Sequence, residues 1–92
     1  MVVRFRKQAL KSLQKSDGEI SAEVREKLGQ IDNFFTELSI LPFSEFDLKK
    51  MKGEWAGFYR LRVGSIRIIL KIDEKSKIID VYRIGSRGDV YK

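Results

Sequence analysis

Seven basic side chains lie between residues 49 and 71, and they offer the clearest chemistry in this 92-residue chain. The same segment contains a single acid, Glu54. Lysine and arginine bind phosphate, and the planar guanidinium of arginine can bond two phosphate oxygens at once. A polyanionic partner such as nucleic acid is therefore one interpretation of this segment. A charge excess that only keeps the protein soluble is the other.

The net charge of +6 comes entirely from the second half of the chain. Residues 1–46 contain seven basic and seven acidic groups, whereas residues 47–92 contain 12 basic and six acidic ones. The chain has no cysteine and no histidine, which excludes disulfides, Cys/His zinc sites, thiol catalysis and histidine as a base. No apolar run approaches the roughly 20 residues of a membrane span. We expect a cytoplasmic protein with no membrane partner.

The periodicity of apolar residues predicts the elements that must position these cations. Residues 2–5 are β-branched and aromatic, which is typical of a strand. Apolar residues then recur every three or four positions, which predicts a helix over residues 6–15 and a longer one ending at Leu41-Pro42. The period next changes to two, which predicts strands over 57–63, 66–72 and 78–84. We expect one α+β domain over residues 1–92, with the order β-α-α-β-β-β and both helices on one face of an antiparallel sheet.

The short connection at Gly64-Ser65 sets a register between the first two strands of the second half. A two-residue turn with glycine first is typical of type II′ and would pair Val63 with Ile66. One face of this hairpin is then apolar, while Arg62 lies opposite Arg67 on the other face. Arg60 shares that second face. Two arginines directly opposite one another destabilise a sheet, so a phosphate-binding role explains them better than folding does.

A four-residue loop at 73–76 extends the register to the last strand. This loop would place Ile79 opposite Leu70 on the apolar face, and Tyr82 opposite Arg67 on the arginine face. Asp80 would share that face and is a plausible ion-pair partner of Arg60. Arg83 falls on the wrong face unless a β-bulge moves it. The segment after the strand contains two glycines, which would let it bend Arg87 and Tyr91 back over the arginines.

Three segments together resemble the RelE/ParE toxin superfamily of type II toxin–antitoxin pairs, on its RelE-like branch. They are Leu48-Lys49-Lys50-Met51-Lys52-Gly53, the hairpin from Phe58 to Ile69, and the C-terminal run from Arg83 to Tyr91. The resemblance covers essentially the whole chain. It implies a microbial-RNase-like fold and a toxin that cleaves messenger RNA in the ribosomal A site, as a metal-independent endoribonuclease without a cofactor. It also implies a cognate, RelB-like antitoxin, which we expect to be acidic and amphipathic.

The resemblance implies roles for particular residues. The expected catalytic set is Arg60, Arg62, Arg67, Arg87 and Tyr91. Further binding of RNA and phosphate is expected from Lys49, Lys50, Lys52, Lys71, Tyr82 and Arg83. The best-known relatives have lysine where this chain has arginine at 60 and 62, and an arginine stays protonated and cannot act as a base. Asp80 is the one weak candidate for a base, and the ribosome could supply the base instead.

Two other functions remain open from the sequence. A ParE-like toxin would inhibit DNA gyrase, although such proteins largely lack the nuclease residues that are present here. A small RNA-binding module without catalysis is the other alternative.

Overall fold

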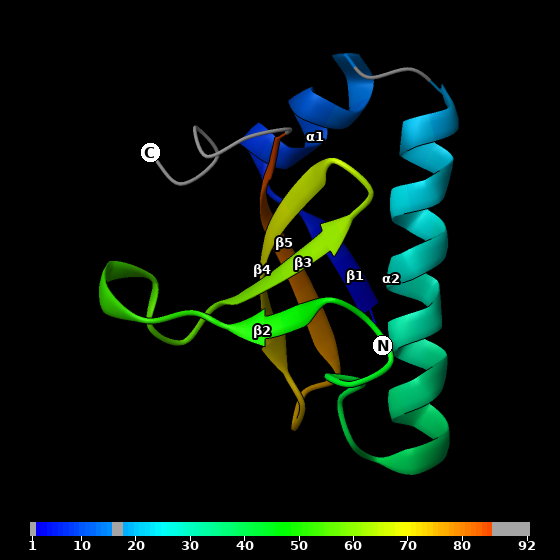
Figure 1. The fold of residues 1–92 in the computed structure, drawn as a ribbon, viewed down its shortest axis with the longest axis vertical. Coiled ribbons are helices and arrows are strands. Elements are labelled where there is room, and N and C mark those ends of the chain that lie inside the picture. The colour runs from blue at the N-terminus through cyan, green and yellow to red at the C-terminus, as the bar shows by residue number, and fades with distance from the viewer. Residues whose placement is uncertain (1, 16–17, 86–92) are drawn as a thin grey trace.

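The computed structural model describes residues 2–15 and 18–85, and Figure 1 shows its ribbon. Two helices and a five-stranded sheet form the fold. In chain order the elements are β1 (Val2–Phe5), α1 (Lys7–Lys15), α2 (Gly18–Leu38), β2 (Leu48–Lys50), the 3₁₀ turn η1 (Gly53–Trp55), β3 (Tyr59–Val63), β4 (Ile66–Asp73) and β5 (Ile78–Gly85). The predicted α+β class is confirmed. The long helix ends at Leu38, earlier than the predicted Leu41-Pro42, because Ser39 adopts a left-handed conformation with φ of 57°.

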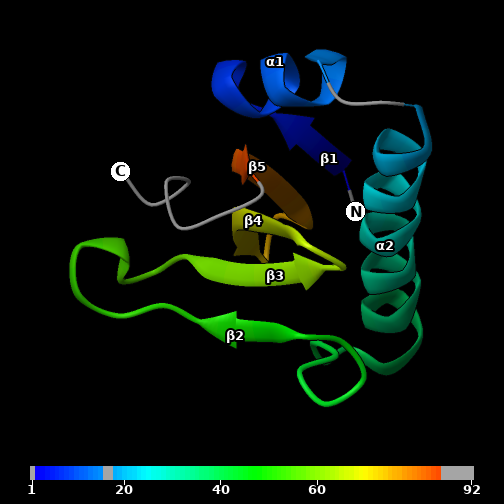
Figure 2. The ribbon, with the colours of Figure 1, turned by 45° about the horizontal axis from the view of Figure 1, so that its top comes forward.

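The strands are arranged in the order β1-β5-β4-β3-β2 (Figure 2). The sheet is antiparallel except that β1 pairs with β5 in parallel. Strand β2 was not predicted, because its three residues show no alternation that could reveal it. It pairs with β3 and forms one edge of the sheet. This additional strand matters for the site, because it brings Lys49 beside the arginines of β3.

Both helices pack on the same face of the sheet and share one apolar core. Helix α2 contributes Val24, Leu28 and Ile31 to this core, and α1 contributes Ala9 and Leu13. These positions follow the apolar period of the sequence, which is the pattern of a helix with one buried side. The sheet contributes alternate residues of each strand. They include Leu61, Val63, Ile68, Leu70, Ile79 and Val81. The opposite face of the sheet is thereby left for polar side chains.

The register predicted between β3 and β4 is confirmed. Val63 pairs with Ile66 and Arg62 lies directly opposite Arg67. Gly64 adopts a positive φ of 60°, as the first position of a type II′ turn requires. Because side chains alternate between faces, burial of Leu61 and Val63 against the helices turns Arg60 and Arg62 to the other side.

The register predicted between β4 and β5 is wrong by two residues. Leu70 pairs with Val81 rather than with Ile79, because the turn is closed by Asp73 and Ile78 and its loop is residues 74–77. The Asp73 carboxylate accepts a hydrogen bond from the backbone N–H of Ser76 and so stabilises this turn. From Ile78 to Val81, a shift of two keeps side chains on their predicted face, which is why the predicted burial of Ile79 and Val81 is correct.

A comparison of two leucines in α2 tests whether this helix holds the sheet in place. Leu28 is 1% exposed in the core, whereas Leu38 is 55% exposed at the helix end. We expect Leu28→Ala to lower the free energy of unfolding by about 2–5 kcal/mol, because it removes buried methyl groups and leaves a cavity. Leu38→Ala is the matched control and should cost less than about 1 kcal/mol. Urea denaturation measures both, and equal losses would contradict the assigned core.

Candidate nucleic-acid interface

The open face of the sheet contains a row of cations that crosses four strands. Lys49 of β2 lies opposite Arg60 of β3, which lies opposite Ile69 of β4, which lies opposite Arg83 of β5. Ile69 is fully buried although it is not part of the helix-covered core. Like charges on adjacent strands repel one another, so folding gains nothing from this row.

Arg83 joins the row because β5 contains the irregularity that would move it. The register shifts between Ile69 and Leu70, so Leu70 faces Val81 while Ile69 faces Arg83. Tyr82 is the extra residue of this β-bulge. The bulge resolves the mismatch of the sequence pattern and turns Arg83 toward the cation row. Its guanidinium carbon lies 5.4 Å from the centre of the Trp55 ring.

A second row lies one pleat further along and contains Arg62 opposite Arg67. The backbone N–H of Arg62 donates to the carbonyl of Asp47, directly before β2. The Asp47 carboxylate lies between the two rows. One of its oxygens accepts a hydrogen bond from Arg60 Nη2 at 3.3 Å, and the other lies 3.7 Å from Arg62 Nε. The single carboxylate of Asp47 therefore contacts the guanidinium groups of both Arg60 and Arg62.

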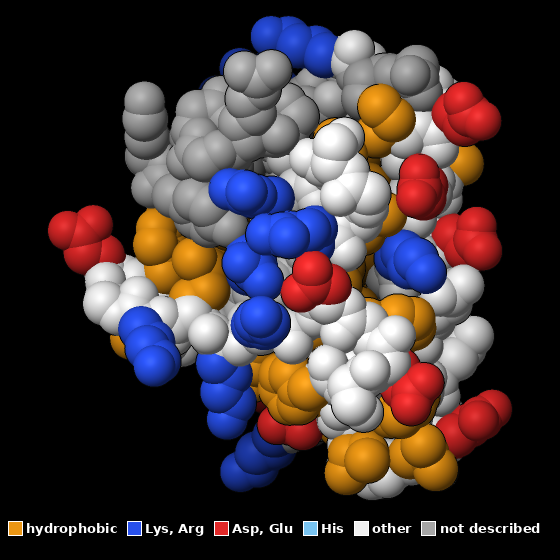
Figure 3. Space-filling view, viewed as in Figure 1, with side chains coloured by type: hydrophobic (Ala, Val, Ile, Leu, Met, Phe, Trp, Pro, Cys, Tyr) orange, Lys and Arg blue, Asp and Glu red, His pale blue; other side chains and the backbone are white. Residues whose placement is uncertain are grey.

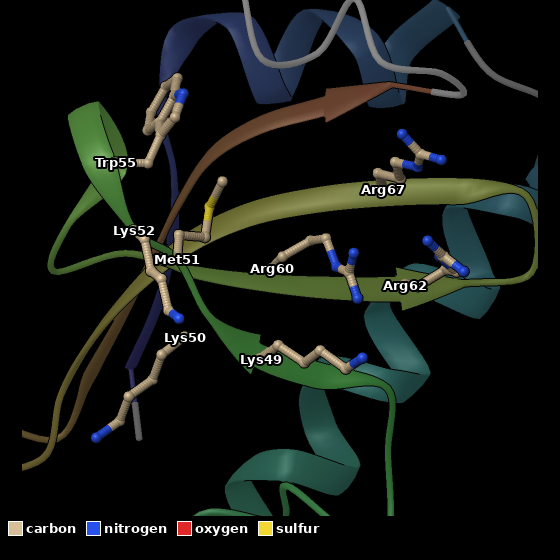
Figure 4. Close-up of a pocket in the computed structure, with 8 residues that line it drawn as sticks. All are labelled: Lys49, Lys50, Met51, Lys52, Trp55, Arg60, Arg62 and Arg67. Atoms are coloured by element: carbon tan, nitrogen blue, oxygen red, sulfur yellow. The ribbon is translucent and has the colours of Figure 1, made fainter.

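Lys49 and Arg60 of the first row and both arginines of the second row line an open pocket of about 470 Å³ whose lining is dominated by cations. Figure 4 shows its side chains projecting from β2, β3, β4 and the η1 loop, and Figure 3 shows Lys and Arg gathered on this face. The lining residues are Lys49, Lys50, Met51, Lys52, Trp55, Arg60, Arg62 and Arg67. Six of these eight are Lys or Arg, so the pocket suits a polyanion that also offers an apolar surface to Trp55 and Met51.

Tyr82 and Asp80 do not lie where the sequence pattern predicted, and Lys71 lies beside Phe58 rather than in the arginine pocket. Tyr82 and Lys71 line a separate pocket of about 590 Å³ rather than the arginine pocket. The Tyr82 ring makes an edge contact with Phe58 at 4.8 Å and lies under the Arg6 guanidinium, instead of facing Arg67. The cause is the changed register of β5 and its bulge. The binding roles expected of Tyr82 and Lys71 remain predictions.

Asp80 pairs with β1 and not with Arg60. Its two carboxylate oxygens accept hydrogen bonds from Arg4 Nε at 2.9 Å and Arg4 Nη2 at 3.0 Å. Arg6 Nε lies 3.8 Å away. The hydrogen bond and the charge of Asp80 raise the pKa of the Arg4 guanidinium above its ordinary value. Asp80 is thus held in a structural ion pair outside the arginine pocket, which removes the reason for considering it as a base.

Of the predicted catalytic set, Arg60, Arg62 and Arg67 come together in one pocket, along with the predicted phosphate binders Lys49, Lys50 and Lys52. Arg87 and Tyr91 lie outside the described residues. The catalytic and binding roles of all these residues remain predictions at this point.

Comparison with known proteins gives the family. The model of the ParE toxin of type II toxin–antitoxin systems, parDE, matches residues 3–91. The chain belongs to this toxin family. No curated protein sequence matches it. The description of the family names ParE, whereas the similar solved structures of higher identity are RelE-type complexes, and both lie within the superfamily that the sequence resembles.

Two solved structures support the RelE-like assignment within the ParE toxin family. The chain is 30% identical to the toxin–antitoxin complex RelBE2 from Mycobacterium tuberculosis, over 96% of this chain and 92% of that one, with a TM-score of 0.70. It is 27% identical to the RelE-RelB complex from Pyrococcus horikoshii, over 95% and 94%, with a TM-score of 0.69. The YoeB/ParE toxin from Agrobacterium tumefaciens shares the fold, with 13% identity, coverage of 95% and 99%, and a TM-score of 0.71.

Three residues at this RelE-like toxin's site were missed by the sequence reasoning. Asp47 contacts Arg60 and Arg62 from just outside the pocket lining, and a carboxylate next to a cation-rich segment could have suggested such an ion pair. Trp55 and Met51 line the pocket. The lone tryptophan was a usable signal, because it stands inside the basic segment and an aromatic ring among cations is typical of nucleic-acid surfaces.

The facing arginines of this family member allow a test of whether the pocket costs stability. We expect Arg62→Gln to raise the free energy of unfolding by about 0.2–1 kcal/mol, because the repulsion that it removes between the directly opposed Arg62 and Arg67 outweighs the loss of the exposed 3.7 Å contact with Asp47. The gain should shrink in about 0.5 M salt, which screens exposed charges. Lys52→Gln is the control, since Lys52 lines the same pocket from outside the strands. Urea denaturation at both salt concentrations gives the result, and a loss of stability in Arg62→Gln would contradict this interpretation.

Proposed function

We propose that this toxin is an endoribonuclease that cleaves messenger RNA in the ribosomal A site and so stops translation. The observation that supports the proposal most is the pocket in which Arg60, Arg62 and Arg67 come together with three lysines. This arrangement destabilises a sheet and suits the phosphates of an RNA strand. The similarity to RelE-RelB complexes over nearly the whole chain supports it independently.

The reaction we propose needs no group beyond the RNA and the protein's own side chains, except for a base. The 2′-oxygen attacks the adjacent phosphorus while the base takes its proton, and the bond from phosphorus to the 5′-oxygen breaks. The 5′-oxygen then takes up the proton that the base removed, so that a 2′,3′-cyclic phosphate and a 5′-hydroxyl result. Arg60, Arg62 and Arg67 bind the phosphate and stabilise the negative charge that develops on its oxygens. The family resemblance implies that Arg87 would act at the leaving oxygen and that Tyr91 would stack on or orient a nucleotide.

The proton of the 2′-hydroxyl must go to a base that the pocket lining does not supply. Among the described residues that line the arginine pocket, none is a carboxylate or a histidine. The carboxylate of Asp47, just outside this lining, is already bonded to Arg60 and lies 3.7 Å from Arg62. Arginine stays protonated and cannot accept this proton. The ribosome is therefore our candidate for the base, and this agrees with cleavage that depends on the ribosome.

We also propose an antitoxin as the physiological partner. The solved structures similar to this chain include RelE-RelB and RelBE2 complexes. An acidic, amphipathic antitoxin segment would neutralise the basic pocket by helix docking or by adding a strand to a sheet edge. Induction of the toxin with and without the product of the adjacent gene tests this directly. We expect growth and translation to stop when the toxin is induced alone and to recover when the product of the adjacent gene is supplied as well.

Two readouts separate this function from its alternatives. A toxin that poisons DNA gyrase would produce DNA damage before it affected translation. An RNA-binding module without catalysis would bind RNA and never cut it, on or off the ribosome. The similar structures at 27–30% identity are RelBE2 and RelE-RelB complexes, which favours the nuclease.

Substitution of single arginines tests the assigned site. We expect Arg67→Ala and Arg87→Ala each to slow cleavage of ribosome-bound messenger by about 10²-fold, because each removes a charge that stabilises the transition state. Lys11→Gln is the control, since Lys11 is an exposed cation of α1 and does not line the pocket. Cleavage is followed by primer extension on messenger bound to purified ribosomes. Wild-type rates in both arginine variants would show that the site is assigned wrongly.

A further inference from the structure

Two carboxylates on the open face of the sheet bind arginines in different ways. Asp80 binds Arg4 through both oxygens at 2.9 and 3.0 Å, and its side chain is only 14% exposed. Asp47 divides its oxygens between Arg60 and Arg62, with one longer contact of 3.3 or 3.7 Å to each, and is 39% exposed. Asp80 thus accepts two hydrogen bonds from the guanidinium of Arg4. Asp47 makes only one contact with each of Arg60 and Arg62, so neither guanidinium has a two-bond partner in this carboxylate.

Arg60 has a guanidinium that its contact with Asp47 leaves partly unbonded. Its side chain is 22% exposed, yet its Nε has no hydrogen-bond partner among the described residues and is itself buried. A buried N–H that lacks an acceptor is costly, and a phosphate oxygen is the kind of acceptor that would relieve it. Asp47 therefore satisfies only part of what Arg60 can bind.

The backbone keeps Asp47 at this position whatever its side chain does. The Asp47 carbonyl accepts a hydrogen bond from the backbone N–H of Arg62 at 2.9 Å, which continues the pairing of β2 with β3. The carboxylate can therefore rotate into water without disturbing the strand. It stands between the two arginines at the margin of the pocket that they line.

We propose that Asp47 is a resident anion that occupies Arg60 and Arg62 in the free protein and is displaced by phosphate. This inference rests on the proposed function only in taking these arginines as phosphate binders. Asp47 acts through the arginines and is a positioning residue. In the free protein it holds the two guanidiniums together against their repulsion, and when phosphate binds it leaves. The affinity of the pocket for phosphate is lowered by the ion pairs that must first break.

Removal of the Asp47 carboxylate changes phosphate affinity in opposite directions under this proposal and under a purely structural role. If Asp47 only supported the site, its removal would weaken phosphate binding. If it competes with phosphate, its removal strengthens binding by about two- to fivefold, which is the range set by exposed ion pairs. The salt dependence should steepen as well, by about 0.7 in the slope of log affinity against log salt for each arginine freed to neutralise a phosphate of single-stranded RNA.

Titration with inorganic phosphate provides the first test. The Nε–H resonances of Arg60 and Arg62 are followed by NMR in the full-length protein, in wild type, Asp47→Asn and Asp47→Ser. We expect both variants to give a midpoint about two- to fivefold lower than that of wild type. Glu45→Gln is the matched control, because it removes one negative charge from the same loop without an ion pair to either arginine. It should leave the midpoint at the wild-type value.

Binding of an uncleavable 2′-O-methyl RNA octanucleotide at several salt concentrations provides the second test. A steeper slope in Asp47→Asn supports the proposal, and an unchanged slope with an unchanged phosphate midpoint overturns it. A midpoint that rises in both variants also overturns it, since Asp47 would then only support the site. A lowered phosphate midpoint in a protein that never cuts ribosome-bound RNA would refute the proposed nuclease and leave this inference standing.

Discussion

The register of β3 against β4 is the constraint on which the site depends. The two-residue connection at Gly64-Ser65 requires a positive φ at Gly64, and this fixes which residues face each other. A slip of one residue would turn Leu61 toward water and Arg60 toward the helices, so burial of the apolar side chains enforces the same register. The position of the arginines is therefore a consequence of core packing on the other face of the sheet.

Hydrophobic burial must also compensate for the repulsion within the cation rows. Arg62 faces Arg67 and Lys49 faces Arg60, and each such pair costs up to about 1 kcal/mol. The buried apolar residues of α2 and the sheet contribute considerably more, since a fully buried leucine or isoleucine is worth about 1.5–3 kcal/mol. Asp47 reduces the repulsion by lying between Arg60 and Arg62. The fold tolerates the pocket because apolar burial on the helix-covered face of the sheet stabilises the protein, while the repulsion between cations is confined to the open face.

The sequence predicted what depends on periodicity and short loops, and it failed where pairing depends on tertiary contacts. The β3/β4 hairpin followed from alternation and a two-residue turn, and with it the grouping of Arg60, Arg62 and Arg67. Loop length alone did not give the β4/β5 register, because a loop of the predicted four residues lies one position further along the chain, at residues 74–77, where Asp73 accepts a hydrogen bond from the backbone N–H of Ser76. The bulge that turns Arg83 was suspected from the pattern, but periodicity could not locate it. Strand β2 was missed because three residues show no period.

The alternation that made the site predictable also couples it to the core. Arg60 and Arg62 flank Leu61 along β3, and Leu61 is 1% exposed between sheet and helices. A backbone shift that fills a cavity at Leu61 would move both guanidiniums relative to Arg67. Phosphate recognition by arginine depends on fork geometry more than on charge alone. Substitutions at apolar positions that never contact RNA should therefore affect the pocket, whereas the lysines at its rim contribute a charge that tolerates displacement.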